Sequence, residues 1–258
     1  MATLSYHEQK DIENIKKLRE LQKELPSFCS DFFRGIETST STRTRIAYAY
    51  DLKIFFQFLK TANPGTFDNP SHTLTPSDLE KLTVTDLEEY IDYLKCHPSD
   101  TNEDVINTER GLMRKVSSLR SFYSYFFRNE RIEKNPAALV RMPKLHEKEI
   151  IRLEIDEVAK LLDEVEEGDK LTEKQKLYHE RTKVRDLAMM SLLLGTGIRV
   201  SECVGLNIND IDLDTCGARV YRKGGKESVI YFSDEVRDVL ENYLDEREMI
   251  DAVPGNED

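Results

Sequence analysis

The residues that could do chemistry lie close together in residues 195–228, GTGIRVSECVGLNINDIDLDTCGARVYRKGGKES. Arg199 stands at a predicted helix start, and Lys223 at the tip of a predicted β-hairpin. A guanidinium can donate two parallel hydrogen bonds to phosphate oxygens, and a lysine ammonium binds phosphate as a point charge. The two residues together indicate one half of a phosphate-handling active site.

The charge of the chain is unevenly distributed. A net charge of -12, taken alone, argues against a nucleic-acid-binding protein. Residues 1–107 hold 12 Lys and Arg against 18 Asp and Glu, and residues 149–258 hold 15 against 27. Residues 108–148 reverse this balance, with 10 against 4. Because salt screens charges over about 10 Å, a polyanion meets this basic segment rather than the average of the chain.

Length and composition predict a folded protein with one large domain or two ordinary ones, since 39% of the 258 residues are hydrophobic. No cysteine pair has the spacing of a zinc site or a CxxC motif, so we expect reduced thiols and no metal. The chain has no apolar signal segment and no run of about 18 apolar residues, which predicts a cytoplasmic protein without a membrane segment. The four cysteines are Cys29, Cys96, Cys203 and Cys216.

The first half of the chain has the apolar period of helices. We expect Ser77 and Thr85 to cap two short helices, with Glu88 completing a capping box after Thr85. A longer helix should begin near Val105, after a loop at 98–104, and carry its basic residues away from its apolar side. The expected helices cover residues 8–24, 43–60, 77–82, 85–97 and 105–130. This pattern predicts a helical bundle with one basic surface.

The second half changes from a helical period to a period of two and back. Gly168 should end one helix, and residues 169–183 should be loop or solvated helix. We expect Val200, Cys203 and Val204 to face the core from a helix that begins after the turn at residues 195–197. The expected helices cover residues 153–168, 185–197, 198–206 and 234–250, and the expected strands cover 218–222 and 227–233.

Several motifs together resemble the tyrosine recombinases, in particular the Xer-like and phage-type integrases of bacteria. They are SSLRSFYSYFFRNERIEKNPAALVRMPK, LLLGTGIRVSECVGLNINDID and VYRKGGKES, in the family's order, and the similarity covers roughly residues 25 to 245. The resemblance implies a mainly α protein: a helical, SAM-like core-binding bundle, followed by the N-terminal part of an α+β catalytic domain with a small β-hairpin. The implied divisions are an extension at 1–24, a core-binding domain at 25–134, a linker at 135–148, and a catalytic domain at 149–258, incomplete at its C-terminus.

The resemblance also implies roles in strand transfer through a covalent enzyme–phosphate intermediate. Arg199 matches the first catalytic arginine of the family, and Glu202, one turn later, could orient it. Lys223 matches the catalytic lysine, which can protonate the departing 5′-oxygen. Lys226 is the alternative lysine, and Lys223 is favoured because the first lysine of the family's turn acts.

Other parts of the family's active site are absent from the sequence. The family continues with a second arginine in an HxxR box and with a tyrosine nucleophile, whereas all five histidines precede Lys223. Tyr231 and Tyr243 follow it, and we expect both to pack in the core. We therefore expect a C-terminally truncated chain that cannot cleave DNA by itself.

Double-stranded DNA is the expected partner, with no metal or nucleotide cofactor. The complete protein should act as a homo-tetramer on DNA, and this chain should be mainly monomeric. The alternatives are a catalytically inactive DNA-binding or regulatory fragment and an acidic helical adaptor. Chromosome-dimer resolution, phage integration and transposon mobility stay open. The expected phosphate contacts are Thr42, Arg43, Arg45, Lys53, Arg114, Lys115, Arg120 and Lys226.

Overall fold

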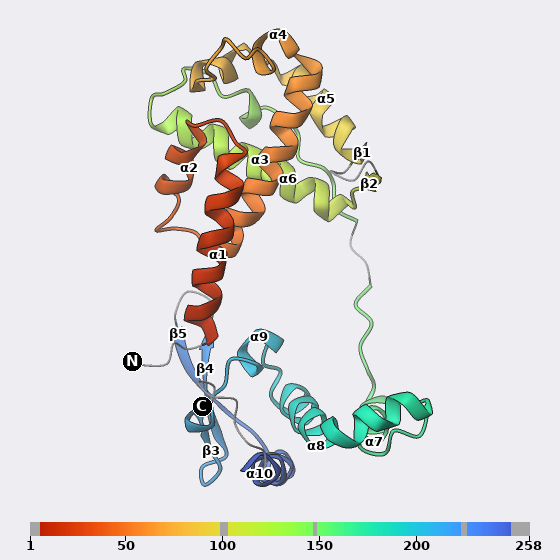
Figure 1. The fold of residues 1–258 in the computed structure, drawn as a ribbon. Coiled ribbons are helices and arrows are strands. Elements are labelled where there is room, and N and C mark those ends of the chain that lie inside the picture. The colour runs from red at the N-terminus through yellow and green to blue at the C-terminus, as the bar shows by residue number, and fades with distance from the viewer. Residues whose placement is uncertain (1–5, 99–102, 147–148, 223–225, 249–258) are drawn as a thin grey trace. The chain divides into compact units, whose positions relative to one another are not determined.

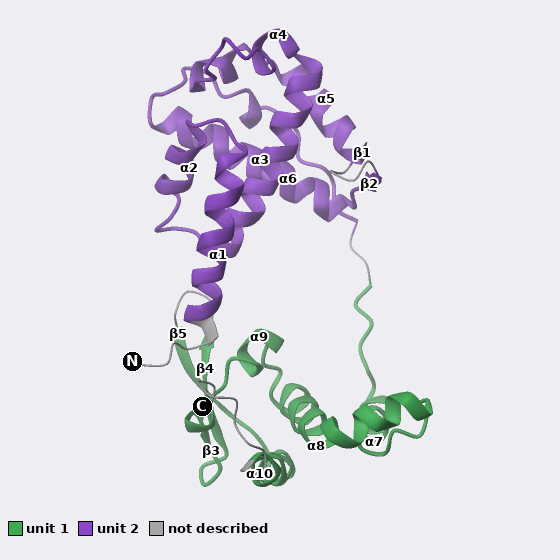
Figure 2. Ribbon diagram, viewed as in Figure 1, with its two compact units in different colours: residues 1–7, 149–258 green, residues 8–148 purple. Residues whose placement is uncertain are grey.

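The computed structural model describes residues 6–98, 103–146, 149–222 and 226–248. The chain forms two compact units, Glu8–Lys148 and Glu149–Asp258, the latter grouped with Met1–His7 (Figure 2). Each unit has its own hydrophobic core. The mainly α fold expected from the sequence is confirmed. No helix in the described ranges is both long and apolar enough to cross a membrane.

The N-terminal unit is a helical bundle with one small hairpin (Figure 1). The longest helices are α3 and α6, which pack against each other. Its elements are α1 (Tyr6–Lys23), α2 (Cys29–Gly35), α3 (Thr42–Ala62), α4 (Pro64–Phe67), η1 (Pro76–Lys81), α5 (Val84–Lys95), β1 (Cys96–Pro98), β2 (Asp104–Ile106), α6 (Glu109–Arg128) and η2 (Pro136–Ala138).

The core of this unit is unusually aromatic. The fully buried ring of Phe122 on α6 lies 5.2 Å from Phe32 on α2 and 6.2 Å from Phe56 on α3, both edge to face. Such pairs contribute about 0.5–1.5 kcal/mol beyond their area burial. Gly35 allows the ring of Tyr125 to lie against the end of α2, because an added Cβ would stand 2.1 Å from that ring. Aromatic packing therefore holds α2, α3 and α6 together.

Three expected helix starts are wrong. The helix α5, expected at 85–97, is capped by Thr83 with Asp86, not by Thr85 with Glu88. Both pairs have capping-box spacing, and the earlier start brings Val84 into the helix, where it packs against the core. In η1 the capping residue is Thr75 instead of Ser77, because Pro76 can occupy the first helical position.

The long helix also starts later than Val105. Residues Cys96–Pro98 and Asp104–Ile106 pair as an antiparallel hairpin, and this places Val105 in a strand opposite His97. The helix α6 begins at Glu109, where the Thr108 hydroxyl accepts a hydrogen bond from the Gly111 N–H. The β-branched pair Val105 and Ile106 favours the strand.

The C-terminal unit combines helices with a three-stranded antiparallel sheet of order β3-β4-β5. Its buried core is smaller than that of the first unit. The elements are α7 (Ile155–Glu167), α8 (Glu173–Thr196), α9 (Val200–Cys203), η3 (Ile208–Asp210), β3 (Ile211–Asp212), β4 (Gly217–Arg222), β5 (Lys226–Tyr231) and α10 (Asp234–Glu248).

Two helices of this unit end where the sequence indicates, but α8 begins at Glu173 rather than at 185, and α9 is shorter than the expected 198–206. Gly168 and Gly197 adopt positive φ at the ends of α7 and α8, as left-handed C-cap glycines do. The charged residues 169–183 contribute most of the first half of α8. The expectation for α9 is wrong, because Val200 is 65% exposed and Val204 is also exposed. The helix is a single turn that directs Glu202 and Cys203 inward, which leaves both valines outside.

The strands β4 and β5 present two different faces. Ala218 and Val220 are buried against the helices, and the alternating positions Arg219 and Tyr221 are exposed. Tyr231, expected in the core, lies opposite Gly217 on that outer face and is 71% exposed.

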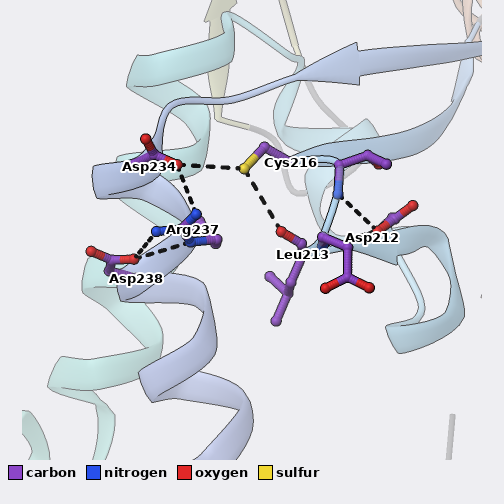
Figure 3. Close-up of polar contacts among 8 residues, drawn as sticks. Asp212, Leu213, Cys216, Asp234, Arg237 and Asp238 are labelled. Carbon is purple, nitrogen blue, oxygen red and sulfur yellow. Dashed lines mark hydrogen bonds and ion pairs between the residues drawn. The ribbon is translucent and has the colours of Figure 1, made fainter.

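A polar network joins the β3–β4 turn to the start of α10 (Figure 3). The Asp212 carboxylate accepts hydrogen bonds from the backbone N–H groups of Asp214 and Thr215. Cys216, with φ of 50°, directs its Sγ toward the Leu213 carbonyl and the Asp234 carboxylate. The turn is thereby fixed against α10, and β4 starts from a defined position.

Candidate phosphate-binding site and DNA interface

Arg199 occupies the N-cap of α9, directly after the Gly197 turn that ends α8. Its backbone N–H donates to Glu202 Oε2 at 3.1 Å, and its Nη1 donates to Glu202 Oε1 at 2.7 Å. Both oxygens of one carboxylate therefore hold one arginine, by its backbone and by its side chain. The second link fixes the direction of the guanidinium.

Of the Arg199–Glu202 ion pair, only the carboxylate is buried. The Glu202 side chain is 5% exposed, whereas the Arg199 side chain is 70% exposed. The hydrogen bond from the Arg199 backbone lowers the pKa of Glu202, and the Arg199 side chain and the charge of Arg222 act in the same direction against burial. The carboxylate stays ionised while the guanidinium faces solvent, where it can bind an anion.

The lysines of the hairpin are only partly described. Lys223 lies outside the described residues, so its predicted role stays a prediction. Lys226 is the first residue of β5, directly opposite Arg222 on β4, and both are exposed. The expected hairpin is confirmed by this pairing.

The residues predicted to contact phosphate from α3 mostly make internal contacts. The Thr42 hydroxyl donates to Asp11 at 2.7 Å, and the Lys53 ammonium lies 2.9 Å from Glu24. The buried Arg45 donates to Glu37 at 2.7 Å. These contacts join α3 to α1 and to the residues after α2. Arg43 is exposed instead.

The same holds on α6. Arg114 donates to Asp51 at 2.6 Å across the α3–α6 contact. Arg120 donates to the carbonyl groups of Ala137, Ala138 and Val140, and so holds the turn that contains η2.

Lys115 is not on the basic surface where the sequence placed it. It is 8% exposed, and its ammonium donates to Asn107 Oδ1 at 2.7 Å. Burial also lowers its pKa. A phosphate could reach it only after a local rearrangement.

Among the basic side chains that are open to a phosphate on these helices are Arg43, Arg110 and Arg114. Arg43 and Arg110 are exposed and form no hydrogen bond or ion pair with the part of the chain that the structure describes. Arg110 lies in the basic segment 108–148 but is not among the predicted phosphate contacts. Its position in the first turn of α6, next to the solvent-exposed Glu109, is the signal that could have indicated its exposure. DNA contact by any of these residues stays a prediction.

A metal site needs several ligand side chains close together, and this requirement applies to the part of the chain that the structure describes. Within the described ranges no group of three His, Cys, Asp or Glu side chains could hold a metal ion. The four cysteines are free thiols, and burial raises the pKa of Cys203.

The two tyrosines that follow the hairpin turn lie in different surroundings. Tyr231 is on the outer face of β5, opposite the face that packs against the helices. Tyr243 packs against the core from α10.

Comparison with known proteins identifies the class of protein. Residues 151–256 match the sequence model described as the Phage integrase family. Tyrosine recombinase XerC of Caldanaerobacter subterraneus subsp. tengcongensis is 34% identical over 228 residues, which are 85% of this chain and 58% of that protein. Tyrosine recombinase XerS of Streptococcus uberis is 31% identical over 259 residues, covering 91% of this chain and 71% of that protein. The chain belongs to the tyrosine recombinase family, in its Xer-like branch.

Solved structures share the fold. XerH site-specific recombinase bound to a palindromic difH substrate superposes with a TM-score of 0.54 at 15% identity, over 83% of this chain and 55% of that one. A lambda integrase dimer bound to a COC' core site superposes with a TM-score of 0.53 at 16% identity, over 87% of this chain and 56% of that one. The chain spans about three fifths of the length of the first curated relatives, 58% and 59%.

The buried Asp51 supplies a pH-dependent prediction. Burial raises its pKa from 3.8 to about 6, against the opposing effects of Arg114, Lys115 and Ser118. A raised carboxyl pKa contributes stability below the unfolded-state value and loses it as the pH rises through about 6. Relative to Asp51→Asn, the wild type should lose up to about 3 kcal/mol of unfolding free energy between about pH 4 and pH 7.

Urea unfolding across this pH range measures the difference. Asp92→Asn, which removes an exposed carboxylate of α5, is the control and should change the pH profile far less. Parallel profiles for the wild type and Asp51→Asn would contradict the assignment.

Proposed function

We propose that this chain binds duplex DNA and acts in site-specific recombination, holding the phosphate at the cleavage site. The observation that carries the proposal is the double link between Arg199 and Glu202, with the carboxylate buried and the guanidinium exposed. A surface arginine needs no such support, whereas a transition-state contact must be held in place. Family membership supplies the chemistry.

The proposed reaction is transesterification at phosphorus. In the complete family enzyme a tyrosine oxygen bonds to phosphorus, the bond to the 5′-oxygen breaks, and a 3′-phosphotyrosine forms. The departing 5′-oxygen takes a proton, which Lys223 is proposed to supply. A 5′-hydroxyl then attacks phosphorus, the tyrosine leaves, and the strands are rejoined. Arg199 donates to the non-bridging oxygens as their charge rises.

Duplex binding is assigned mainly to the N-terminal unit. Its basic segment, residues 108–148, stands in an otherwise acidic chain. Arg43 on α3 and Arg110 on α6 are proposed as phosphate contacts because they are exposed and form no ion pair within the described residues. Such contacts set the position on the duplex without reading its sequence.

A second candidate function is DNA binding without cleavage by this polypeptide. It is favoured by the positions of Tyr231, exposed on the outer sheet face, and Tyr243, packed in the core. Assembly as a homo-tetramer on DNA is proposed for the complete protein, and a mainly monomeric state in the cytoplasm for residues 1–258 alone. XerH with difH and lambda integrase with its core site are precedents for a DNA partner.

The DNA interface predicts how salt affects binding. Arg43→Ala with Arg110→Ala should reduce the slope of log affinity against log salt by about two, because each contact releases about one counterion. Fluorescence anisotropy with a labelled duplex at several NaCl concentrations measures it. Lys174→Ala with Arg181→Ala, on the exposed first half of α8, removes the same charge and should leave the slope unchanged. Equal slopes for the two double variants would remove α3 and α6 from the interface.

Residues 1–258 should form no covalent adduct with a suicide DNA substrate, since Tyr231 lies exposed on the outer sheet face and Tyr243 packs against the core. Denaturing gel electrophoresis of the incubated protein should show only free protein and uncut DNA, while a family recombinase that contains its tyrosine, run in parallel, gives the adduct. An adduct with residues 1–258 that is lost in Tyr231→Phe or Tyr243→Phe would overturn the second candidate.

A further inference from the structure

The end of the β4–β5 hairpin carries an unfavourable pair of charges. Arg222 and Lys226 are direct cross-strand partners, and both are exposed. Like charges directly opposite each other destabilise a sheet. Neither side chain forms an ion pair with a residue in the described ranges, and the nearest compensating charge for Arg222 is the Glu202 carboxylate, which attracts it at longer range. Replacing either residue with a neutral one would remove this electrostatic repulsion.

The pair lies on the same side of the sheet as Arg199. Side chains alternate along β4, so Arg222 shares the face of the buried Ala218 and Val220. The helix α9, which carries Arg199 and Glu202, packs against β4. The charge of Arg222 also acts on the Glu202 carboxylate. Two arginines from different elements therefore approach one buried carboxylate.

An anion is the ligand that this arrangement fits. An anion between the two cations would offset their repulsion, and the cations would in turn neutralise the charge of the anion. Arg222 supplies a planar fork of donors and Lys226 a point charge, a combination suited to the oxygens of a phosphate. Glu202 forms no hydrogen bond with Arg222 or Lys226 in the described ranges, and both of its oxygens already accept from Arg199.

We propose that Arg222 and Lys226 form a clamp for a second backbone phosphate of the DNA duplex, beside the phosphate held by Arg199. The clamp rests on the proposed function and extends the site by one phosphate. It gives Lys226 a binding role and leaves proton donation to Lys223. It also assigns Arg222, which the motif comparison did not single out, to the DNA interface.

The hairpin provides its own matched control. Arg219 lies on the same strand and is also exposed, but it points to the outer face, opposite Val229. Arg219→Ala therefore removes the same side chain as Arg222→Ala from the other side of the sheet. Lys226→Glu separates binding from folding, because an Arg–Glu cross-strand pair stabilises the hairpin while it repels a phosphate.

The test measures duplex DNA affinity against NaCl concentration, with thermal unfolding of each variant without DNA. Arg222→Ala and Lys226→Ala should each reduce the salt slope by about one and weaken binding several-fold, and Arg219→Ala should do neither. Lys226→Glu should weaken binding further while it raises the Tm of the free protein.

The outcomes distinguish the clamp from the proposed function. If the wild type binds duplex DNA and Arg222→Ala keeps the slope of Arg219→Ala, the clamp is wrong and the proposed function stands. If Lys226→Glu lowers both Tm and affinity, the charge repulsion on which the clamp rests is absent. If the wild type does not bind duplex DNA at low salt, the proposed function fails, and the clamp fails with it.

Discussion

The functional half of the structure depends on one carboxylate. Glu202 lies in the core-facing turn of α9 and accepts from both the backbone and the side chain of Arg199. The backbone link starts the helix, and the side-chain link directs the guanidinium outward. Moving either residue would disturb both links, so the helix cap and the proposed phosphate contact depend on the same carboxylate. The turn at Gly197 and the packing of α9 against β4 place the Arg199–Glu202 pair beside the sheet.

The N-terminal unit uses several of the basic residues predicted to contact phosphate to hold its own elements together. Arg114 and Asp51 join α6 to α3, and Arg120 holds the turn after the bundle by three carbonyl groups. A buried charge is tolerated only with such partners, because desolvation is costly. A basic segment in the sequence is therefore not yet a basic surface. The exposed basic side chains proposed for DNA contact are Arg43, Arg110 and the exposed part of Arg114.

The sequence was informative where local chemistry decides the structure. The helix stop at Gly168, the hairpin between β4 and β5, and the N-cap position of Arg199 all follow from short patterns. It was less informative where two patterns compete. Thr83 and Thr85 both have capping-box spacing, and which of them caps α5 depends on how Val84 packs.

Contacts between distant residues could not be predicted from local patterns. The pairing of Asp51 with Arg114 spans 63 positions, and nothing near either residue indicates it. Tyr231 was misplaced because strand alternation fixes two faces but not which one is covered. The exposed side of the C-terminal sheet was thus known only once the helices were placed. Lys223 is the reverse case, because its catalytic role is predicted from the motif alone and the residue lies outside the described ranges.

The central claim is that Arg199, fixed by Glu202, holds a DNA phosphate. A crystal structure of this chain with duplex DNA tests it most directly. The account predicts a backbone phosphate within hydrogen-bond distance of the Arg199 guanidinium, with both links to Glu202 kept. A bound duplex that leaves Arg199 facing solvent, or a phosphate contact made only after the Glu202 side chain has turned away, would contradict it.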